Sequence, residues 1–292
     1  MTKIKCVVAL IDLNDEYSGA VEKAAFLAKA NSASLELVSI DYSSYLEDGQ
    51  FFDPLQAAQL RLEMLEDHRL QLDEIAGSLR GEDLKVDTFA AWGHPSYKSL
   101  NEHIKTPEAT LVVKATQHHN KIARLFLSNE DWDLIRHCAS QLLLVKGKPW
   151  PKEPVFVTAI DTNHANDKPA ALDLKMVAGS QALAKACSGE VHLFHRDSVP
   201  PFMGVYTLIM NEEDRSAKLA EFGKKAGVEV ENCHWTDTPI ENALPKLLGK
   251  LDASAVVMGA ISRSGLDRVL IGSTAERLLD LIDRDVLIVK PD

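Results

Sequence analysis

Continuous apolar runs open both halves of the chain. Residues 6–11 read Cys-Val-Val-Ala-Leu-Ile, and residues 155–160 read Val-Phe-Val-Thr-Ala-Ile. Each run leads into the sequence Ile-Asp-x-Asn, which places Asp12 and Asp161 at matching positions. A short run that is apolar on both faces is typical of a central parallel strand covered by helices. The repetition predicts that the chain contains two copies of one α/β unit.

The same order of elements follows each apolar run, because apolar residues at helical spacing alternate with further short apolar runs. We expect strands at residues 6–11, 35–40, 84–92, 110–114 and 142–146, and again at 155–160, 191–195, 228–235, 255–259 and 286–290. We expect helices around residues 20–28, 55–79, 96–105 and 129–137, and again around 177–184, 211–226, 240–250 and 274–283. Strands that alternate with helices imply right-handed crossovers and a parallel sheet covered on both faces.

The pattern therefore predicts two tandem, doubly wound α/β domains, each with a five-stranded parallel sheet. Residues 148–154 read Lys-Pro-Trp-Pro-Lys-Glu-Pro, and the three prolines make this segment stiff and partly extended. We interpret it as the linker and expect domains at residues 1–149 and 150–292. Two halves with matched surfaces are expected to pack as a pseudo-dimer within the chain. The sequence leaves open whether two chains form a homodimer.

Charge and composition argue against several classes of protein. The 292 residues carry a formal net charge of −11. A nucleic-acid-binding protein usually presents a basic face, so nucleic acid is not an expected partner. No apolar run approaches the roughly 20 residues of a membrane helix, and the first run stops at Asp12 without a signal-peptide cleavage site. We therefore expect a cytoplasmic protein with no membrane attachment, in which the four cysteines are reduced structural thiols.

A glycine-bearing loop in the second half is the main candidate for a binding site. It runs from Gly259, at the end of an expected strand, through Gly265 and Gly272 to Ser273 and Thr274. Gly259 would let the backbone turn sharply off the strand. Ser273 or Thr274 would cap the next helix, whose free N–H groups and dipole attract a phosphate. The alternative is a capped helix after an ordinary loop.

The spacing within this loop resembles that of ATP-binding universal stress proteins. The family frame, G-x2-G-x9-G-[S/T], is here occupied by Gly259, Ser262, Gly272 and Ser273. The strand and helix order of both halves is also similar to the family, which implies an adenine nucleotide alpha hydrolase-like fold. The resemblance implies that the second half binds a nucleotide of the ATP or AMP type, together with Mg²⁺. It implies a site formed by Asp161, Arg196, Gly259, Ser262, Gly265, Gly272, Ser273 and Thr274.

Two residues of this site depart from the family pattern. Ser262 replaces the second glycine and adds a side chain where backbone should approach a phosphate. Arg196 follows the second strand, where the family places an apolar residue against adenine. Its guanidinium would stack on the base or pair with a phosphate instead. The sequence leaves open whether Ser262 and Arg196 abolish ATP binding.

The equivalent loop of the first half has lost every glycine. Aligned from Lys114, the frame reads Lys114, Gln117, Leu127 and Ser128. This loop resembles that of the tandem, E-type universal stress proteins, which implies that the first half does not bind ATP in the usual way. Ser128 is expected to cap a helix with an acidic first turn.

Basic and histidine side chains occupy the same first-half loop. Lys114, Lys121 and Arg124 would either bind an anionic ligand or form a solvated basic loop. His118 and His119 are adjacent, and adjacent residues rarely point at one ion, so no metal site is expected there.

Aromatic residues gather in the irregular stretches after the second strands. The first stretch covers residues 42–54 and the second covers residues 200–206. Both are expected near the carboxyl end of the sheet, where they would either line an apolar pocket or fill the core between the halves.

These features favour a ligand-binding protein over an enzyme. The sequence contains no nucleophile-elbow, metal or hydride-transfer motif. We expect a non-catalytic stress-response protein that binds a small-molecule ligand and acts through protein partners, whose identity the sequence leaves open. One alternative is a binder of a lipid-like or anionic ligand, or an interaction scaffold without nucleotide. The other is a weak ATPase in which Asp161 and Asp267 hold Mg²⁺.

Overall fold

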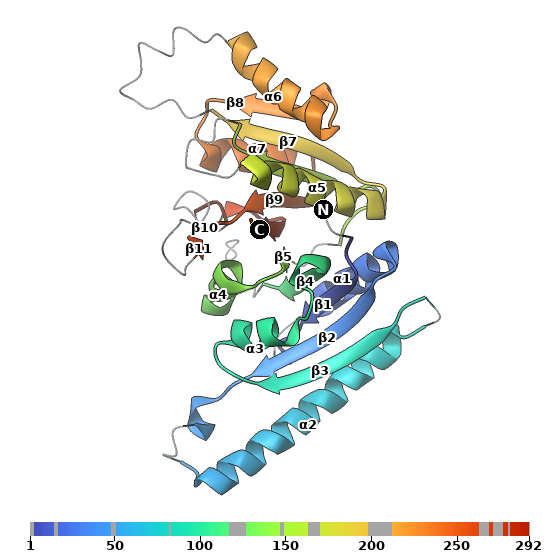
Figure 1. Ribbon diagram of the computed structural model, residues 1–292, viewed down its shortest axis with the longest axis vertical. Coiled ribbons are helices and arrows are strands. Elements are labelled where there is room, and N and C mark those ends of the chain that lie inside the picture. The colour runs from blue at the N-terminus through green and yellow to red at the C-terminus, as the bar shows by residue number, and fades with distance from the viewer. Residues whose placement is uncertain are drawn as a thin grey trace. The chain divides into compact units, whose positions relative to one another are not determined.

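The chain folds into two compact units (Figure 1). The computed structural model describes residues 3–14, 17–47, 51–81, 83–116, 127–146, 149–162, 170–197, 212–262, 269–270, 277–279 and 281–291. The described residues up to Pro149 form the first unit, and the second unit begins at Trp150. Each unit is a parallel sheet with helices packed against it, as the repeat in the sequence predicts.

Five parallel strands form the sheet of the first unit, in the order β3-β2-β1-β4-β5. They are β1 (Cys6–Leu10), β2 (Ser34–Asp41), β3 (Val86–Trp92), β4 (Thr110–Ala115) and β5 (Gln141–Val145). The strand β1 lies in the middle because it is apolar on both faces, and Val7, Val8 and Ala9 are at most 1% exposed. The doubly wound order predicted for this half is therefore confirmed.

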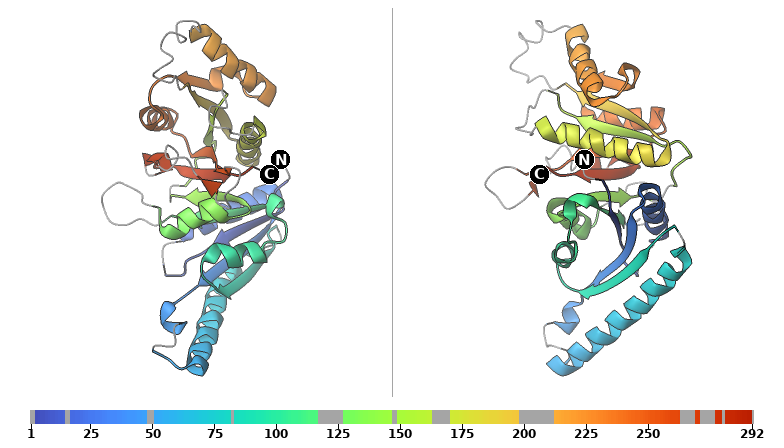
Figure 2. Two further views of the ribbon diagram at one scale, coloured as in Figure 1. Left: turned by 60° about the vertical axis from the view of Figure 1, so that its left-hand side comes forward. Right: turned by 45° about the vertical axis from the view of Figure 1, so that its right-hand side comes forward.

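Helices cover both faces of this sheet (Figures 1 and 2). They are α1 (Ser18–Asn31), α2 (Pro54–Leu79), α3 (Ser96–His103) and α4 (Asn129–His137), with short 3-10 turns η1 (Ser44–Leu46) and η2 (Pro107–Ala109). The Thr88 hydroxyl of β3 donates to Asp73 of α2 at 3.0 Å, whereas the next residue, Phe89, stacks on His103 of α3. Because successive side chains of a strand point to opposite faces, α2 and α3 cover opposite sides of the sheet.

The second unit repeats this layout. Its sheet has the order β12-β9-β6-β7-β8, which corresponds strand for strand to β5-β4-β1-β2-β3. The strands are β6 (Val155–Ile160), β7 (Glu190–Arg196), β8 (Cys233–Thr236), β9 (Ala255–Gly259) and β12 (Asp285–Val289). The helices are α5 (Ala170–Cys187), α6 (Glu212–Ala226) and α7 (Ile240–Lys250), followed by helical residues at 277–279 and 281. The repeat in the sequence is thus also a repeat in topology.

Two segments of the second unit differ from the expectation. The strand expected at residues 228–235 begins only at Cys233, because η5 (Val230–Asn232) forms a 3-10 turn. After β9, the chain forms an antiparallel ribbon in which β10 (Ile261–Ser262) pairs with β11 (Val269–Leu270). The apolar pattern did not predict this ribbon, because two-residue strands are too short to show a period.

The described part of the chain contains neither a disulfide nor a helix that is long and apolar enough to cross a bilayer. All four cysteines are free thiols, and Cys138 and Cys187 are buried. Burial raises the pKa of the Cys187 thiol to about 11 and also raises the pKa values of Cys6 and Cys233. These three thiols therefore remain protonated near neutral pH, as structural cysteines do.

Candidate functional site

Three of the four described members of the expected nucleotide site lie at the carboxyl edge of the second sheet. The strand β6 pairs with both β7 and β9 in parallel. Asp161 directly follows β6, and Arg196 and Gly259 are the last residues of β7 and β9. Parallel strands share one carboxyl edge, so the structure brings these three residues to the edge where open α/β sheets bind ligands. Gly265, Asp267, Gly272, Ser273 and Thr274 lie outside the described residues.

A buried carboxylate fixes the backbone at this edge. Asp173 lies near the start of α5 and is 1% exposed. Its Oδ1 accepts a hydrogen bond from the backbone N–H of Asp161 at 3.3 Å. A carboxylate in a first helical turn is favoured by the helix dipole, so Asp173 ties the end of β6 to the start of α5. The signal in the sequence is an acidic residue early in the helix that follows the strand, and our site prediction missed it.

A buried histidine lies beside Asp161. The ring of His195, which is 3% exposed, has Nδ1 at 3.2 Å from the carbonyl oxygen of Ile160 and Nε2 at 3.2 Å from the Thr162 hydroxyl. A carbonyl oxygen only accepts, so Nδ1 is the donor. In the neutral ring, Nε2 then accepts the proton of the Thr162 hydroxyl. His195 therefore orients the turn after β6, and sequence reasoning missed this residue as well.

Arg196 lies half-buried at the end of β7, level with Thr236 of β8. Its Nε atom is buried and has no hydrogen-bond partner in the part of the chain that the structure describes. A buried N–H group without an acceptor costs free energy, and a ligand oxygen would relieve that cost. Among the described residues, Arg196 therefore brings a donor without an acceptor to the same edge as Asp161.

The structure assigns Gly259 a different role from the expected sharp turn. Gly259 is still part of β9 and pairs with Val289 of β12, and its φ lies outside the left-handed region. A Cβ atom at this position would lie 2.9 Å from Cδ2 of Leu172 and 2.9 Å from Sδ of Met176, both on α5. The prediction of a sharp turn at Gly259 is therefore wrong. An added Cβ would force the Leu172 or Met176 side chain to shift, so glycine allows α5 to pack directly against the strand.

Ser262 stands in the β10–β11 ribbon, where its backbone pairs with Val269. The expected loop is thus partly ordered by strand pairing at its start. The family frame treats this stretch as a loop between strand and helix, so the ribbon is an addition to the expected arrangement.

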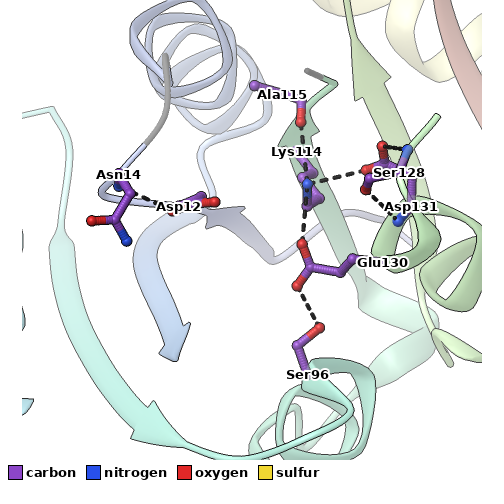
Figure 3. Close-up of polar contacts among 8 residues, drawn as sticks. All are labelled: Asp12, Asn14, Ser96, Lys114, Ala115, Ser128, Glu130 and Asp131. Carbon is purple, nitrogen blue, oxygen red and sulfur yellow. Dashed lines mark hydrogen bonds and ion pairs between the residues drawn. The ribbon is translucent and has the colours of Figure 1, made fainter. Parts of the chain in front are cut away.

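In the first unit, an ion-pair cluster occupies the corresponding edge (Figure 3). The Nζ atom of Lys114 lies 3.0 Å from Oδ1 of Asp131 and 3.3 Å from Oε2 of Glu130. Lys114 is 5% exposed and Asp131 is fully buried. Burial by itself lowers the pKa of Lys114, but the carboxylates of Asp131 and Glu130 outweigh burial, so the pKa is raised. The expectation that Lys114 belongs to a solvated basic loop is wrong, because internal carboxylates neutralise its charge.

The start of α4 supplies both carboxylates. Ser128 caps this helix: its hydroxyl accepts from the backbone N–H of Asp131 at 3.1 Å, and the Asp131 carboxylate accepts from the backbone N–H of Ser128 at 2.8 Å. The cap predicted at Ser128 is confirmed as a complete capping box. Glu130 also accepts from the Ser96 hydroxyl of α3 at 2.6 Å, so the cluster joins β4, α3 and α4 (Figure 3).

Strand register identifies the counterpart of Gly259 in the first unit. Gly259 pairs with Val289, and Ala115 pairs with Val145, at matching points of the two sheets. Ala115, and not Lys114, is therefore the equivalent of Gly259. The alignment that starts at Lys114 is wrong by one residue, although the conclusion that this position carries no glycine still holds.

With this alignment, the positions of the ion-pair cluster carry uncharged residues in the second unit. The positions of Lys114, Glu130 and Asp131 are taken by Met258, Thr274 and Ala275. Met258 is buried on β9, as expected for an apolar replacement of a buried lysine. The two units thus differ in the buried cation and in both of its carboxylates together.

Asp12 occupies the first-unit position that Asp161 occupies in the second. Asp12 is exposed, and its Oδ1 accepts a hydrogen bond from the backbone N–H of Asn14 at 3.0 Å (Figure 3). It therefore stabilises the turn after β1.

The remaining expected sites fall partly outside the described residues. Gln117, His118, His119, Lys121 and Arg124 are outside them. Among the residues that are described, no three His, Cys, Asp or Glu side chains are grouped as metal ligands would be.

Aromatic side chains after β2 are exposed. Tyr42, Tyr45 and Phe51 are 38%, 63% and 65% exposed, and Tyr45 packs edge-on against Phe51. These three residues are therefore not core residues of the first unit. The second aromatic stretch, residues 200–206, lies outside the described residues.

Known proteins share both the sequence pattern and the fold. Residues 3–146 and 159–290 each match the Universal stress protein family. The chain is 24% identical over 304 residues to universal stress protein E of Escherichia coli K12, in an alignment that covers 100% of this chain and 96% of the relative. It is 22% identical over 303 residues to universal stress protein E of Photorhabdus laumondii, with the same coverage. A solved structure from Pseudomonas aeruginosa PAO1, described as functionally unknown, aligns with a TM-score of 0.77 at 23% identity, over 99% of this chain and 93% of that one.

The family match extends over both units, and the relatives align with the chain from end to end. The repeated strand order agrees with the two separate matches, because it shows the same fold in both units. The chain therefore belongs to the universal stress protein family of stress-response proteins, as an E-type tandem of two such domains.

Proposed function

We propose that this stress protein is a non-catalytic ligand-binding protein whose second unit takes one nucleotide of the ATP or AMP type, while its first unit takes none. The observation that carries the proposal is the contrast between the units at matching positions. Lys114, Glu130 and Asp131 form an ion-pair cluster at the sheet edge of the first unit. The second unit has uncharged residues at these positions.

The cluster makes the first unit a poor phosphate site for two physical reasons. A phosphate approaching the start of α4 would meet the carboxylates of Glu130 and Asp131, and like charges repel strongly near a buried site. The backbone N–H of Asp131 is already taken by the Ser128 hydroxyl. Lys114 offers no free charge, since both carboxylates pair with it.

The second unit offers three features that suit a nucleotide. Asp161 stands at the strand end on a backbone that Asp173 fixes. Arg196 carries a buried N–H donor that a phosphate or ribose oxygen would satisfy. The sequence Gly272-Ser273-Thr274 precedes helical residues, in the pattern of a helix start that binds anions.

We propose binding without turnover because Asp173, one of the described carboxylates near this edge, serves the fold. Asp173 accepts a backbone hydrogen bond, and we assign Asp161 to the Mg²⁺ ion that would accompany the nucleotide. Efficient phosphoryl transfer needs both a metal clamp and a group that positions water.

Calorimetric titration of the full chain with ATP and with AMP, each with and without Mg²⁺, tests the proposal. Asp161→Ala should weaken binding by about tenfold or more, the loss expected for a hydrogen-bonded charge. The matched variant Asp12→Ala should leave it unchanged. Loss of binding in the Asp12 variant, or no loss in either variant, contradicts the proposed site.

Mg²⁺-dependent phosphate release that disappears in Asp161→Ala would assign a weak ATPase instead. Absence of nucleotide binding, with a lipid extracted from the purified protein, would assign a different ligand class.

A further inference from the structure

An apolar stripe runs along the outer side of α2. Leu55, Leu62 and Leu70 are 81%, 64% and 59% exposed. At 100° per residue, their positions fall within about 80° of each other around the helix axis and span about 22 Å. We call these three residues the α2 outer face. The buried residues of α2, which include Leu72 and Ala76, lie on the side that packs against β3.

This concentration of exposed apolar surface is unusual within the described part of the chain. Ten large hydrophobic side chains are exposed there, and five of them lie between residues 45 and 70. Tyr45 and Phe51 precede α2 in the chain and contact each other at a centroid distance of 5.2 Å. Gln59 and the ion pair of Glu66 with Arg69 lie between the leucines of the outer face on the same side of the helix, so apolar and polar side chains alternate there. Exposed apolar residues that gather on one face and are rimmed by polar residues mark an interaction site.

The helix is held independently of this stripe. Asp53 caps α2 through hydrogen bonds from the backbone N–H groups of Leu55 and Gln56, at 2.9 and 3.0 Å. On the other side, the Asp73 carboxylate accepts from Thr88 of β3. The leucines of the outer face are therefore not needed to form or dock α2.

Carboxylates line one side of the outer face. Glu63, Asp67 and Glu74 are exposed and follow one another at spacings of four and seven residues, which puts them in one row beside the leucines. The helix has five carboxylates against two arginines. Both arginines are already paired, Arg61 with Glu47 at 2.7 Å and Arg69 with Glu66 at 3.4 Å.

We propose that the α2 outer face is a docking surface for a partner protein that presents a basic amphipathic helix. Apolar residues of that helix would cover the three leucines, and its lysines or arginines would face the row of carboxylates. The same charges disfavour two other occupants. An anionic membrane surface would repel the row, and a second copy of α2 would bring a second surplus of carboxylates.

Fluorescence anisotropy with the full chain and a labelled peptide tests this inference. The probe is a helical peptide of about 18 residues, or five turns, with leucines on one face and lysines on the other. Its twin has glutamate in place of lysine. The variant Leu55→Gln, Leu62→Gln, Leu70→Gln keeps good helix formers at exposed positions, so it should fold. The matched control is Leu174→Gln, because Leu174 on α5 is 50% exposed but lies outside the stripe.

The lysine peptide should bind the wild-type chain and the Leu174 variant equally. The triple variant should bind it about tenfold or more weakly, because apolar anchors dominate helix-in-groove binding. Equal binding of the glutamate twin, or a loss of less than about twofold in the triple variant, overturns the proposal.

A self-association seen in sedimentation velocity and abolished by the triple variant would assign the face to a second copy. Cosedimentation with phosphatidylglycerol vesicles, abolished in the same way, would assign it to a membrane. Either outcome contradicts a basic partner helix.

Discussion

The ammonium group of Lys114 lies 3.0 Å from a carboxylate oxygen of Asp131, and both side chains are withdrawn from solvent. Lys114 follows the apolar residues of β4, next to the last residue of the strand, and Asp131 belongs to the first turn of α4. In the second unit, the same two positions carry Met258 and Ala275. This single pair therefore marks the chemical difference between two halves of one fold.

Removing one partner of this ion pair should strongly lower the unfolding free energy of the first unit. Lys114→Met removes the cation and leaves Asp131 as an uncompensated buried charge, which costs about 3–5 kcal/mol of unfolding free energy. Adding Glu130→Thr and Asp131→Ala to the same chain recreates the residue set of the second unit and should recover most of that loss, because the buried charges are removed together. Urea unfolding of the two variants measures the difference. A triple variant as unstable as Lys114→Met would show that the cluster is not a coupled set.

Substitution at Gly259 should reveal its packing role. Gly259→Ala places a methyl group 2.9 Å from side-chain atoms of Leu172 and Met176, and overpacking of a tight interface costs about 1–3 kcal/mol. Gly249→Ala is the matched control in the same unit, because a Cβ at Gly249 meets no atom within 4 Å. That control should be neutral or stabilise α7 by up to about 1 kcal/mol. Thermal unfolding measures both, and equal effects of the two alanines would contradict the close packing of α5 on β9.

A histidine pair on the second sheet should make stability fall in acid. The Nδ1 atom of His192 lies 2.9 Å from Nε2 of His234. Burial, followed by the nearby charges of His192 and Lys250, lowers the pKa of His234 from its ordinary 6.5. The unfolded chain therefore binds a proton at His234 more readily than the folded chain does. Its contribution to stability is complete above pH 6.5 and is lost as the pH falls towards the lowered folded value.

Unfolding free energies of the wild type and of His234→Asn between about pH 5 and 7.5 measure this contribution. The wild type should lose more stability than the variant as the pH decreases through this range. Parallel pH profiles of the two unfolding free energies would contradict a contribution of His234 to the pH dependence. A constant offset between the profiles reports only the lost hydrogen bond to His192.

The strands were predictable because buried parallel strands are apolar on both faces, as Val7 to Ala9 illustrate. The ion-pair cluster was harder to predict because Lys114 is far from Glu130 and Asp131 in the sequence, and only the folded chain brings their side chains together. The signal was present in the repeat, since an alignment through Val145 and Val289 would have set Lys114 against Met258 and Asp131 against Ala275. Periodicity cannot report such long-range pairing of charges.

The arrangement of residues at the proposed site of the second unit was predictable only in part. Asp161 and Arg196 lie at the expected edge because each ends or follows a strand that the apolar pattern identifies. His195 and Asp173 were missed because their roles are hydrogen bonds to backbone atoms, which leave no spacing in the sequence. Glycine at position 259 makes room for side chains of α5 that pack against β9. A glycine at a flexible turn would look the same in the sequence.

The number of nucleotides bound by one chain tests the central claim most directly. Native mass spectrometry of the full chain, titrated with Mg-ATP to saturation, counts them. We predict a single bound nucleotide, which is lost in Asp161→Ala and retained in Asp12→Ala. Two nucleotides on one chain, or one that survives Asp161→Ala and disappears in Asp12→Ala, would contradict the assignment of the site to the second unit.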